Sequence, residues 1–331
     1  MPHIDARAMR VLVSEPHRGC PSTAIQAGRG GRIYPMKSWQ AWLPLSLTLL
    51  SVGAHAAAPA PVATELGAVT LLDGSAKLLR GATWYKVVAG TRVEESDILD
   101  VAERGQAQIE FPGGGIFNMV GPGFVYLPPA KAKGGPVALF VPQGWVKVVA
   151  KPPGLQLRTA SFNVTVADAI VVMHVTKASV EFFVEQGEGR MVEVAASGAD
   201  GQAHELKRGE YWAKAATGAV TTVSRAPRVF VDQMPRHFID QLHEFAGRLK
   251  SPPPLVVDHE ISFGEAEPWL AGRDRAVFER RFTGRLRDPA FRSAVMPNAA
   301  RYPTWDRILN PEKYEPKKTT DKVEPKKAPA K

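Results

Sequence analysis

One stretch of the chain, residues 144–193, alternates apolar and polar side chains over two long runs. Phe162, Val164 and Val166 are separated by polar residues in the first run, and residues 180–184 repeat the pattern in the second. A period of two places the apolar side chains on one face of a β-sheet and most of the polar ones on the other. This stretch therefore predicts strands that bury one face of a sheet.

Turn-forming residues divide this stretch and the chain on either side of it. Residues 121–123, 152–154 and 186–189 combine glycine with proline or polar residues and predict turns. The whole chain has 29 glycines and 28 prolines in 331 residues, which is typical of folds with many turns. Short strands separated by turns about every ten residues predict a mainly β fold, a sandwich, a barrel or a solenoid, rather than a parallel α/β sheet. We expect this β-domain to span residues 66–231.

A segment near the N-terminus, residues 36–56, has the layout of a secretory signal peptide. Lys37 supplies a positive charge, residues 41–52 are largely apolar, and the segment ends in Ala-His-Ala, which fits a cleavage site. We therefore predict export to the periplasm and a mature chain that starts at Ala57. Residues 1–35 are expected to be an over-long start, and residues 57–65 a Pro/Ala spacer. The alternative is an uncleaved anchor that leaves residues 1–35 in the cytoplasm.

Five short motifs lie in and around the alternating stretch. They are residues 107–111 (AQIEF), 144–149 (GWVKVV), 157–159 (LRT), 184–187 (VEQG) and 206–210 (LKRGE). Together they resemble the FecR-type periplasmic domain, over roughly residues 66–223. The resemblance implies a FecR-like β-domain with a binding role. It also implies an alternative, a membrane-anchored regulator that engages a sigma factor in the cytoplasm and senses a receptor in the periplasm.

The apolar period changes from two to about 3.6 after residue 231, so residues 232–314 are predicted to form a small helical module. We expect the β-domain to fold without it, because residues 66–231 carry their own apolar set. Trp269 and Trp305 are expected to anchor the core of the module. Residues 315–331 repeat Glu-Pro-Lys-Lys and predict a disordered basic tail. The expected helices follow the stripe Phe238, Leu242, Phe245 and Leu249, the stripe Phe278, Phe282 and Leu286, the start signal Asp288-Pro289, and residues 304–309.

No catalytic or metal-binding motif stands out in the predicted mature chain. Its histidines are not spaced to place two ligands on one helix face, and the single cysteine, Cys20, precedes the predicted start. His174 lies in a strand pattern and is interpreted as a partly buried, hydrogen-bonded histidine. We expect no enzyme activity, no cofactor and no metal. The alternative is an envelope glycan-active enzyme, whose carboxylate pair would come from Glu94, Glu95 and Asp97 or from Asp258 and Glu260.

Two basic segments near the C-terminus are candidate contacts for an anionic surface. Seven arginines lie between residues 273 and 292, and seven lysines lie from residue 313 onward, in a chain of formal net charge +9. Such charges attract anionic polymers or head groups over roughly 8 Å at physiological ionic strength. The alternative is a solvated helix face followed by a solubilising tail. The candidates are Arg273, Arg275, Arg280, Arg281, Arg285, Arg287, Arg292, Lys317, Lys318, Lys326 and Lys327.

These observations together predict an exported, non-enzymatic binding or scaffold protein of the cell envelope. It would act in signalling or in assembly through protein or glycan contacts. The expected partner is an envelope protein or an anionic envelope polymer. Nucleic acid is not expected for an exported chain, and membrane contact is expected to be peripheral at most.

Overall fold

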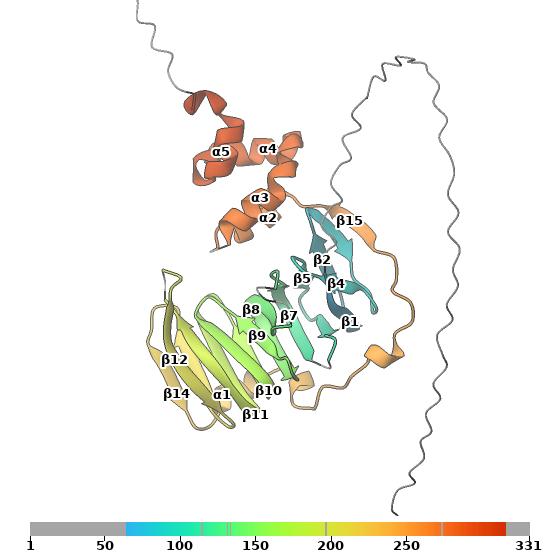
Figure 1. Ribbon diagram of the computed structural model, residues 1–331, viewed down its shortest axis with the longest axis vertical. Coiled ribbons are helices and arrows are strands. Elements are labelled where there is room, and N and C mark those ends of the chain that lie inside the picture. The colour runs from blue at the N-terminus through green and yellow to red at the C-terminus, as the bar shows by residue number, and fades with distance from the viewer. Residues whose placement is uncertain are drawn as a thin grey trace, which may run out of the picture. The chain divides into compact units, whose positions relative to one another are not determined.

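The computed structural model describes residues 64–315, except Gly114, Lys131, Lys133, Ala196 and Arg273. The predicted signal peptide, the residues before it and residues 316–331 of the predicted tail lie outside the described residues. The described part is mainly β, as predicted, with short helices toward its C-terminal end (Figure 1).

The strands of the described residues belong to one mixed sheet of 15 strands. Its strand pairs are antiparallel, except that β8 and β9 run parallel. The main path of the sheet follows the order β14-β13-β11-β10-β9-β8-β7-β5-β2-β3-β15, with β1, β4, β6 and β12 paired beside it. The strands are β1 (Glu65–Asp73), β2 (Ala76–Arg80), β3 (Thr83–Lys86), β4 (Arg92–Glu94), β5 (Ile98–Val101), β6 (Gln106–Glu110), β7 (Ile116–Tyr126), β8 (Val137–Ala150), β9 (Leu155–Arg158), β10 (Phe162–Val175), β11 (Ser179–Val194), β12 (Asp200–Lys207), β13 (Tyr211–Ala215), β14 (Val220–Val223) and β15 (Val256–Glu260).

The long strands change neighbours along their length. The first half of β10 pairs with β9 and the second half with β8, while β11 pairs first with β13 and then with β12. In β10 the change coincides with irregularities in its register with β11. Bulges of this kind let one strand serve two packed layers around a common core.

Two of the predicted turns are not turns between strands but bends within long strands. Residues 186–189 lie within β11, where Gly187 has a φ of 77° and a Cβ atom would lie 2.1 Å from the Asp168 carbonyl oxygen. Residues 121–123 lie within β7, where a Cβ atom on Gly121 would lie 2.1 Å from the Ala102 carbonyl oxygen. Glycine is therefore required at both places for a strand to bend against its neighbour. The turn predicted at residues 152–154 is confirmed.

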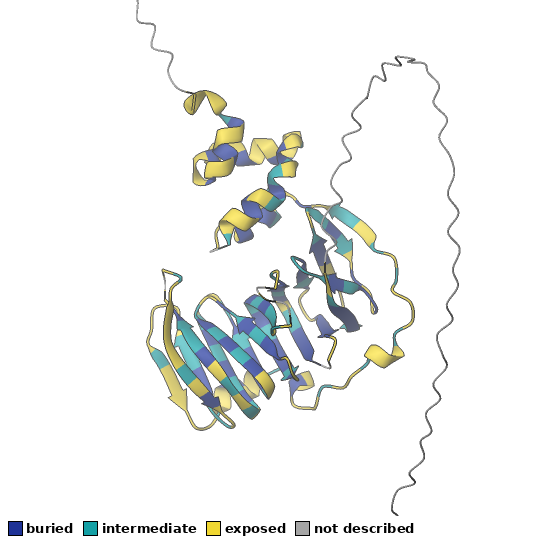
Figure 2. Ribbon diagram, in the orientation of Figure 1, coloured by how far each residue is buried: buried dark blue, intermediate teal, exposed yellow. Residues whose placement is uncertain are grey.

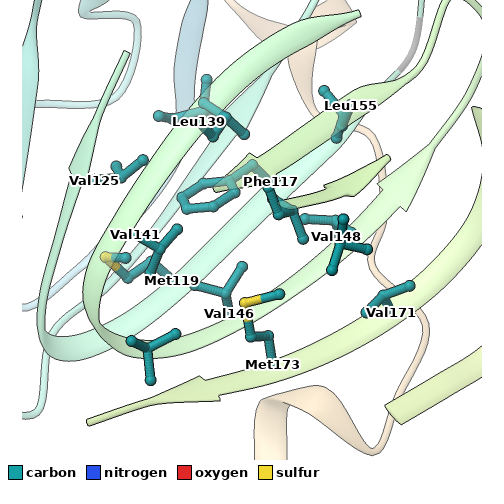
Figure 3. Close-up of a cluster of buried hydrophobic side chains, with 14 of the residues drawn as sticks. Phe117, Met119, Val125, Leu139, Val141, Val146, Val148, Leu155, Val171 and Met173 are labelled. Atoms are coloured by element: carbon teal, nitrogen blue, oxygen red, sulfur yellow. The ribbon is translucent and has the colours of Figure 1, made fainter. Parts of the chain in front are cut away.

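The apolar faces of the strands meet in one large core. Phe162 and Phe182 are fully buried, and their rings pack edge to face with centroids 5.6 Å apart. Phe117, Val146 and Met173, from three adjacent strands, lie together in the same core (Figure 3). Buried and partly exposed positions alternate along β8 to β11 (Figure 2), which confirms the period-two prediction for the alternating stretch.

Short helices follow the last strand of the predicted β-domain. The last strand within residues 66–231 is β14, and α1 follows it. The predicted start at Asp288-Pro289 is confirmed, since the Asp288 side chain accepts a hydrogen bond from the Ala290 N–H at 2.9 Å. No helix in the described residues is long and apolar enough to cross a membrane. The α-helices are α1 (Arg228–Gln233), α2 (Phe263–Leu270), α3 (Arg275–Phe282), α4 (Pro289–Val295) and α5 (Pro303–Leu309), and the 3-10 helices are η1 (Arg236–Phe238), η2 (Ala246–Arg248), η3 (Thr283–Arg287), η4 (Met296–Arg301) and η5 (Pro311–Lys313).

The helix predicted for residues 238–249 is wrong. This segment, which we call the strap (residues 234–250), is irregular apart from the short turns η1 and η2. The predicted apolar stripe is still the face that the strap hides, because Phe238 is fully buried and the other three members are half-buried.

Side chains of the sheet bind the main chain of the strap. The Glu110 carboxylate accepts hydrogen bonds from the N–H groups of Phe245 at 2.6 Å and Ala246 at 2.9 Å. The buried Lys147 ammonium donates to the carbonyl of Phe238 at 2.6 Å. Main-chain groups held in this way cannot form the hydrogen bonds of an α-helix, so these distant contacts override the local pattern.

The predicted helical module and the sheet share a second core. The strand β15 lies inside the module but pairs with β3. A cluster of buried side chains joins Leu79, Trp84, Ile98 and Tyr126 of the sheet to residues of α2, α3, α4 and α5. A chain cut near residue 231 would therefore expose apolar surface of the sheet.

Candidate ligand pocket

A cavity of about 470 Å³ lies between the sheet and the C-terminal helices. Trp84, Phe124 and Phe140 of the sheet line it, together with Trp269 of α2 and Phe278 of α3. The rings of Phe124 and Trp269 meet edge to face at 5.9 Å, and those of Trp269 and Phe278 lie 5.4 Å apart. The cavity is thus enclosed largely by aromatic walls. Its polar and charged lining residues are Asp100, Gln143, Lys177, Glu265 and Asp274.

Strand register explains why these side chains share one face. Asp100 on β5 lies opposite Phe124 on β7 and opposite Lys77 on β2. Leu79, two residues after Lys77, lies opposite Trp84 on β3. Because residues two apart on a strand point to the same face, the register gathers aromatic and charged groups beneath α2.

Asp100 is a half-buried carboxylate that accepts no hydrogen bond from the described residues. Burial raises the pKa of Asp100 to about 6, with Glu265 adding to the rise and Lys77 opposing it. Lys77 is itself paired with Asp258 at 2.9 Å. The charge of Asp100 is therefore left largely uncompensated within the cavity.

Glu265 also lines the cavity, but both of its carboxylate oxygens are occupied. One accepts hydrogen bonds from the Ser262 N–H at 2.9 Å and hydroxyl at 2.7 Å, in the capping box that begins α2. The other lies 2.8 Å from Nε2 of His259. Burial alone would raise the pKa of Glu265, but the hydrogen bonds from Ser262 and His259 hold it below its ordinary value. Of these two carboxylates, Glu265 has both oxygens hydrogen-bonded, whereas Asp100 accepts no hydrogen bond from the described residues.

The arginines predicted to contact an anionic surface divide into two groups. In the first group, Arg281 and Arg285, both guanidinium groups bind main-chain carbonyls of this chain, those of Leu79 and Ile261 among them. Burial lowers the pKa of Arg281 to about 10, so the group stays charged at neutral pH. The exposed members are Arg275, Arg280, Arg287 and Arg292. Arg273, Lys317, Lys318, Lys326 and Lys327 lie outside the described residues.

The carboxylates considered for a catalytic pair do not converge on a common cleft. Glu94 and Asp97 each bind the Arg80 guanidinium at 2.7 Å, and Glu95 accepts a hydrogen bond from the Ala130 N–H at 3.1 Å. Asp258 and Glu260 bind different partners, Lys77 and Arg285 respectively. No group of metal-ligating side chains suited to a metal ion occurs in the part of the chain that the structure describes.

His174 is partly buried, as predicted, but its ring is not fully hydrogen-bonded. The ring stacks on Trp145 at 4.0 Å, and Nδ1 lies 3.4 Å from the Glu181 carboxylate without a well-formed hydrogen bond. Burial lowers the pKa of His174 below its ordinary value. A hollow of about 700 Å³ adjoins this pair, but it is more open and is bounded by small residues such as Gly121 and Ala178. We therefore take the aromatic cavity as the candidate site.

Sequence reasoning missed most of this site. Trp269 was expected only to anchor a core, and it does pack in the second core while also lining the cavity. Asp100 and Trp84 were given no role. Two sequence signals point toward the site: the Ser262-x-x-Glu265 capping box marks the start of α2, and Asp100 interrupts an otherwise apolar strand.

Comparisons with known proteins give only distant likeness. No family model matches the chain, and no curated protein matches it. Two crystal structures of a candidate anti-sigma factor from Parabacteroides distasonis ATCC 8503 are similar at 12% identity, with a TM-score of 0.33. The match covers 39% of this chain and 59% of that one. A likeness this distant assigns no function to the chain.

Proposed function

We propose that this chain is an exported, non-enzymatic binding protein of the bacterial cell envelope, built on a FecR-like β-domain and acting in signalling or assembly. The aromatic cavity is the observation that carries the proposal. Its volume of about 470 Å³ lies in the range of small-ligand sites. Its walls come from the sheet and from α2 and α3, so a bound ligand or partner side chain would touch both parts. Binding there would couple to how the helices pack on the sheet.

A pocket-filling variant tests whether the cavity is a binding site. Gly272 lines the cavity, and a Cβ atom there would meet only the Trp269 carbonyl oxygen, at 3.7 Å. The change Gly272→Phe should therefore place a ring in the cavity without disturbing the main chain. The matched control is Gly284→Phe, because a Cβ atom at Gly284 has no neighbour within 4 Å.

Thermal unfolding of residues 57–331 would be measured against a panel of soluble peptidoglycan fragments, saccharides and small amines. A compound at about 100 times its dissociation constant stabilises the native state by about 2.7 kcal/mol, which raises Tm by several degrees. We expect such a shift for the wild type and for Gly284→Phe, but not for Gly272→Phe. Equal shifts in all three proteins, or none with any compound, would contradict the proposal.

Export itself is tested at the N-terminus. Recovery from the periplasmic fraction of a chain that begins at Ala57 is the expected result. An intact Met1 or Met36 in the membrane fraction would favour the alternative, a membrane-anchored regulator of a sigma factor.

A glycan-active enzyme is the second candidate, because two carboxylates with oppositely shifted pKa values line one cavity. The pKa of Asp100 is raised to about 6, while that of Glu265 is lowered. Glycosidases use such a pair as acid and as nucleophile or base. The existing bonds to Ser262 and His259 leave Glu265 poorly placed for that role. Release of reducing sugar ends from purified sacculi by the wild type, but not by Asp100→Asn, would favour the enzyme over the binding protein.

A further inference from the structure

The aromatic cavity holds a carboxylate that is not paired with any described residue. Asp100 is half-buried, and no described residue donates a hydrogen bond to it. The nearby ammonium of Lys77 is held by Asp258 at 2.9 Å. A carboxylate removed from water without a compensating donor is costly, so such groups are rare unless something else binds them.

The remaining charges of the cavity favour a cation as that partner. Asp100, Glu265 and Asp274 line it against the single cation Lys177, among the described residues. Among the described lining residues, the acidic groups outnumber the basic ones, which favours a cation over an anion. The Phe278 ring, in one wall of the cavity, already lies near a cation, because the Arg281 guanidinium is 5.9 Å from the centre of this ring. Aromatic faces attract cations through the ring quadrupole, most strongly where water is excluded.

We propose that this cavity binds an organic cation, a primary or quaternary ammonium group on a small apolar body. The ammonium group lies against Asp100, and the apolar body packs against the aromatic walls of the cavity. This inference rests on the proposed function, since it requires the cavity to be a ligand site. It adds the ligand class and the residue that selects it.

Binding of this kind is linked to protons. The cation favours the ionised form of Asp100, so below about pH 6 each binding event must release a proton and the affinity falls. The affinity falls by at most about tenfold for each pH unit. Asp100 also borders a second hollow, which Lys77, Lys86 and Asp258 line, and His259 is hydrogen-bonded to that Asp258. The other charged groups that line the aromatic cavity are Glu265 from α2, Asp274 before α3, and Lys177 between β10 and β11.

Choline and its neutral isostere 3,3-dimethylbutan-1-ol are the probes. A protein of residues 57–331 is titrated with each probe at pH 7.5, and with n-butylamine as a primary ammonium compound. Binding is measured by calorimetry and by the fluorescence of the cavity tryptophans. We expect the ammonium compounds to bind at least about tenfold more tightly than the neutral isostere. Equal binding, or preference for the neutral compound, overturns the proposal.

Asp100→Asn keeps the size of the side chain and removes its charge, and Asp168→Asn is the control at an exposed aspartate of β10. We expect Asp100→Asn to weaken choline binding about tenfold or more and to abolish its pH dependence, with Asp168→Asn unchanged. Retention of both properties in Asp100→Asn overturns the proposal. If no ammonium compound binds but another compound is excluded by Gly272→Phe, this inference falls and the proposed function stands. If no compound binds at all, both fall.

Discussion

Glu110 on β6 and Asp100 on β5 are carboxylates that face C-terminal segments of the chain, the strap and α2 respectively. Glu110 accepts hydrogen bonds from the Thr70 hydroxyl, the Gln108 amide and two N–H groups of the strap. Burial alone would raise its pKa, but these donors hold the pKa of Glu110 below its ordinary value. Asp100 accepts none from the described residues, and burial raises its pKa to about 6.

The contrast distinguishes Glu110, whose charge stabilises the fold, from Asp100, whose charge is available to a ligand. Donors around Glu110 replace the water that it loses, so its charge fixes the strap on the sheet. Asp100 loses part of its water, and no described residue donates a hydrogen bond in its place, which costs stability unless something binds. Net charge and motif do not distinguish the two residues. The count of donors around each carboxylate does.

Removing both the strap and the C-terminal helices should have the largest effect on the stability of the fold. A chain of residues 57–235 lacks most of the strap over Glu110 and all the helices over Asp100, and it exposes Trp84, Ile98 and other buried residues of the second core. Because a domain is stabilised by only about 5–15 kcal/mol, we expect this chain to be insoluble or to melt without cooperativity. Calorimetry and circular dichroism are the measurements.

The control for that truncation is a chain of residues 57–315, which removes only the predicted tail and should unfold like the full chain. Cooperative unfolding of residues 57–235 at a similar Tm would show instead that the β-domain is independent, as the sequence predicts.

Breaking the Glu110 contacts should have the next largest effect. Glu110→Gln removes the charge and one of the accepting oxygens, and leaves a donor such as the Phe245 N–H unpaired. We expect a loss of about 2–4 kcal/mol in the free energy of unfolding at pH 7, measured with urea. Glu103→Gln, at an exposed residue, is the control.

The pH dependence of the wild type carries the same information about Glu110. Since its folded pKa is lowered, its contribution to stability is present above its unfolded pKa and is lost as the pH falls through the folded pKa. The stability of Glu110→Gln should therefore change less than that of the wild type below about pH 4.5. Parallel pH profiles would contradict this role.

Local patterns predicted the parts of the fold that local physics decides. Period-two alternation around Phe162 and the Asp288-Pro289 helix start are both confirmed, because neighbouring residues suffice for each. The strap has an equally good helical stripe, yet Glu110 and Lys147, distant in sequence, bind its main chain. Such contacts cannot be inferred from the strap alone.

The pocket was beyond prediction for a similar reason. Asp100 and Trp269 meet only after β5 pairs with β7 and α2 packs on that face. Among the arginines predicted to contact an anionic surface, Arg281 binds main-chain carbonyls within the protein. Charge counts identify basic segments, but they do not tell which side chains the fold turns inward.

Neutralising Asp100 should change the free energy of unfolding by a smaller amount, and should raise it where the change at Glu110 lowers it. Its folded pKa is raised from 3.8 to about 6, so native stability falls as the pH rises through that interval. At pH 7.5 we expect Asp100→Asn to be more stable than the wild type by about 1–2 kcal/mol, a figure reduced for the water that still reaches the carboxylate. The difference should vanish below about pH 4. Destabilisation at pH 7.5 would mean that Asp100 has a partner in solution.

Neutralising exposed arginines should have the smallest effect on stability. Arg287 and Arg292 are exposed, and no described residue forms an ion pair with either, in contrast to the buried guanidinium of Arg281. We expect Arg287→Gln combined with Arg292→Gln to change the free energy of unfolding by less than about 0.5 kcal/mol.

If these two arginines contact an anionic envelope component, the same double variant should co-sediment less with anionic liposomes and with sacculi at low salt. The difference from the wild type should disappear as salt screens the charges, because exposed charges act over only about 8 Å at physiological ionic strength. Arg281→Gln is the opposite case: it should lower stability, since three main-chain carbonyls lose their donor, and leave sedimentation of the folded protein unchanged. Sedimentation unaffected by the double variant at every salt concentration would make these arginines solvated surface. The anionic partner would then have to be sought at the predicted lysine tail, and the cavity would keep its preference for cations.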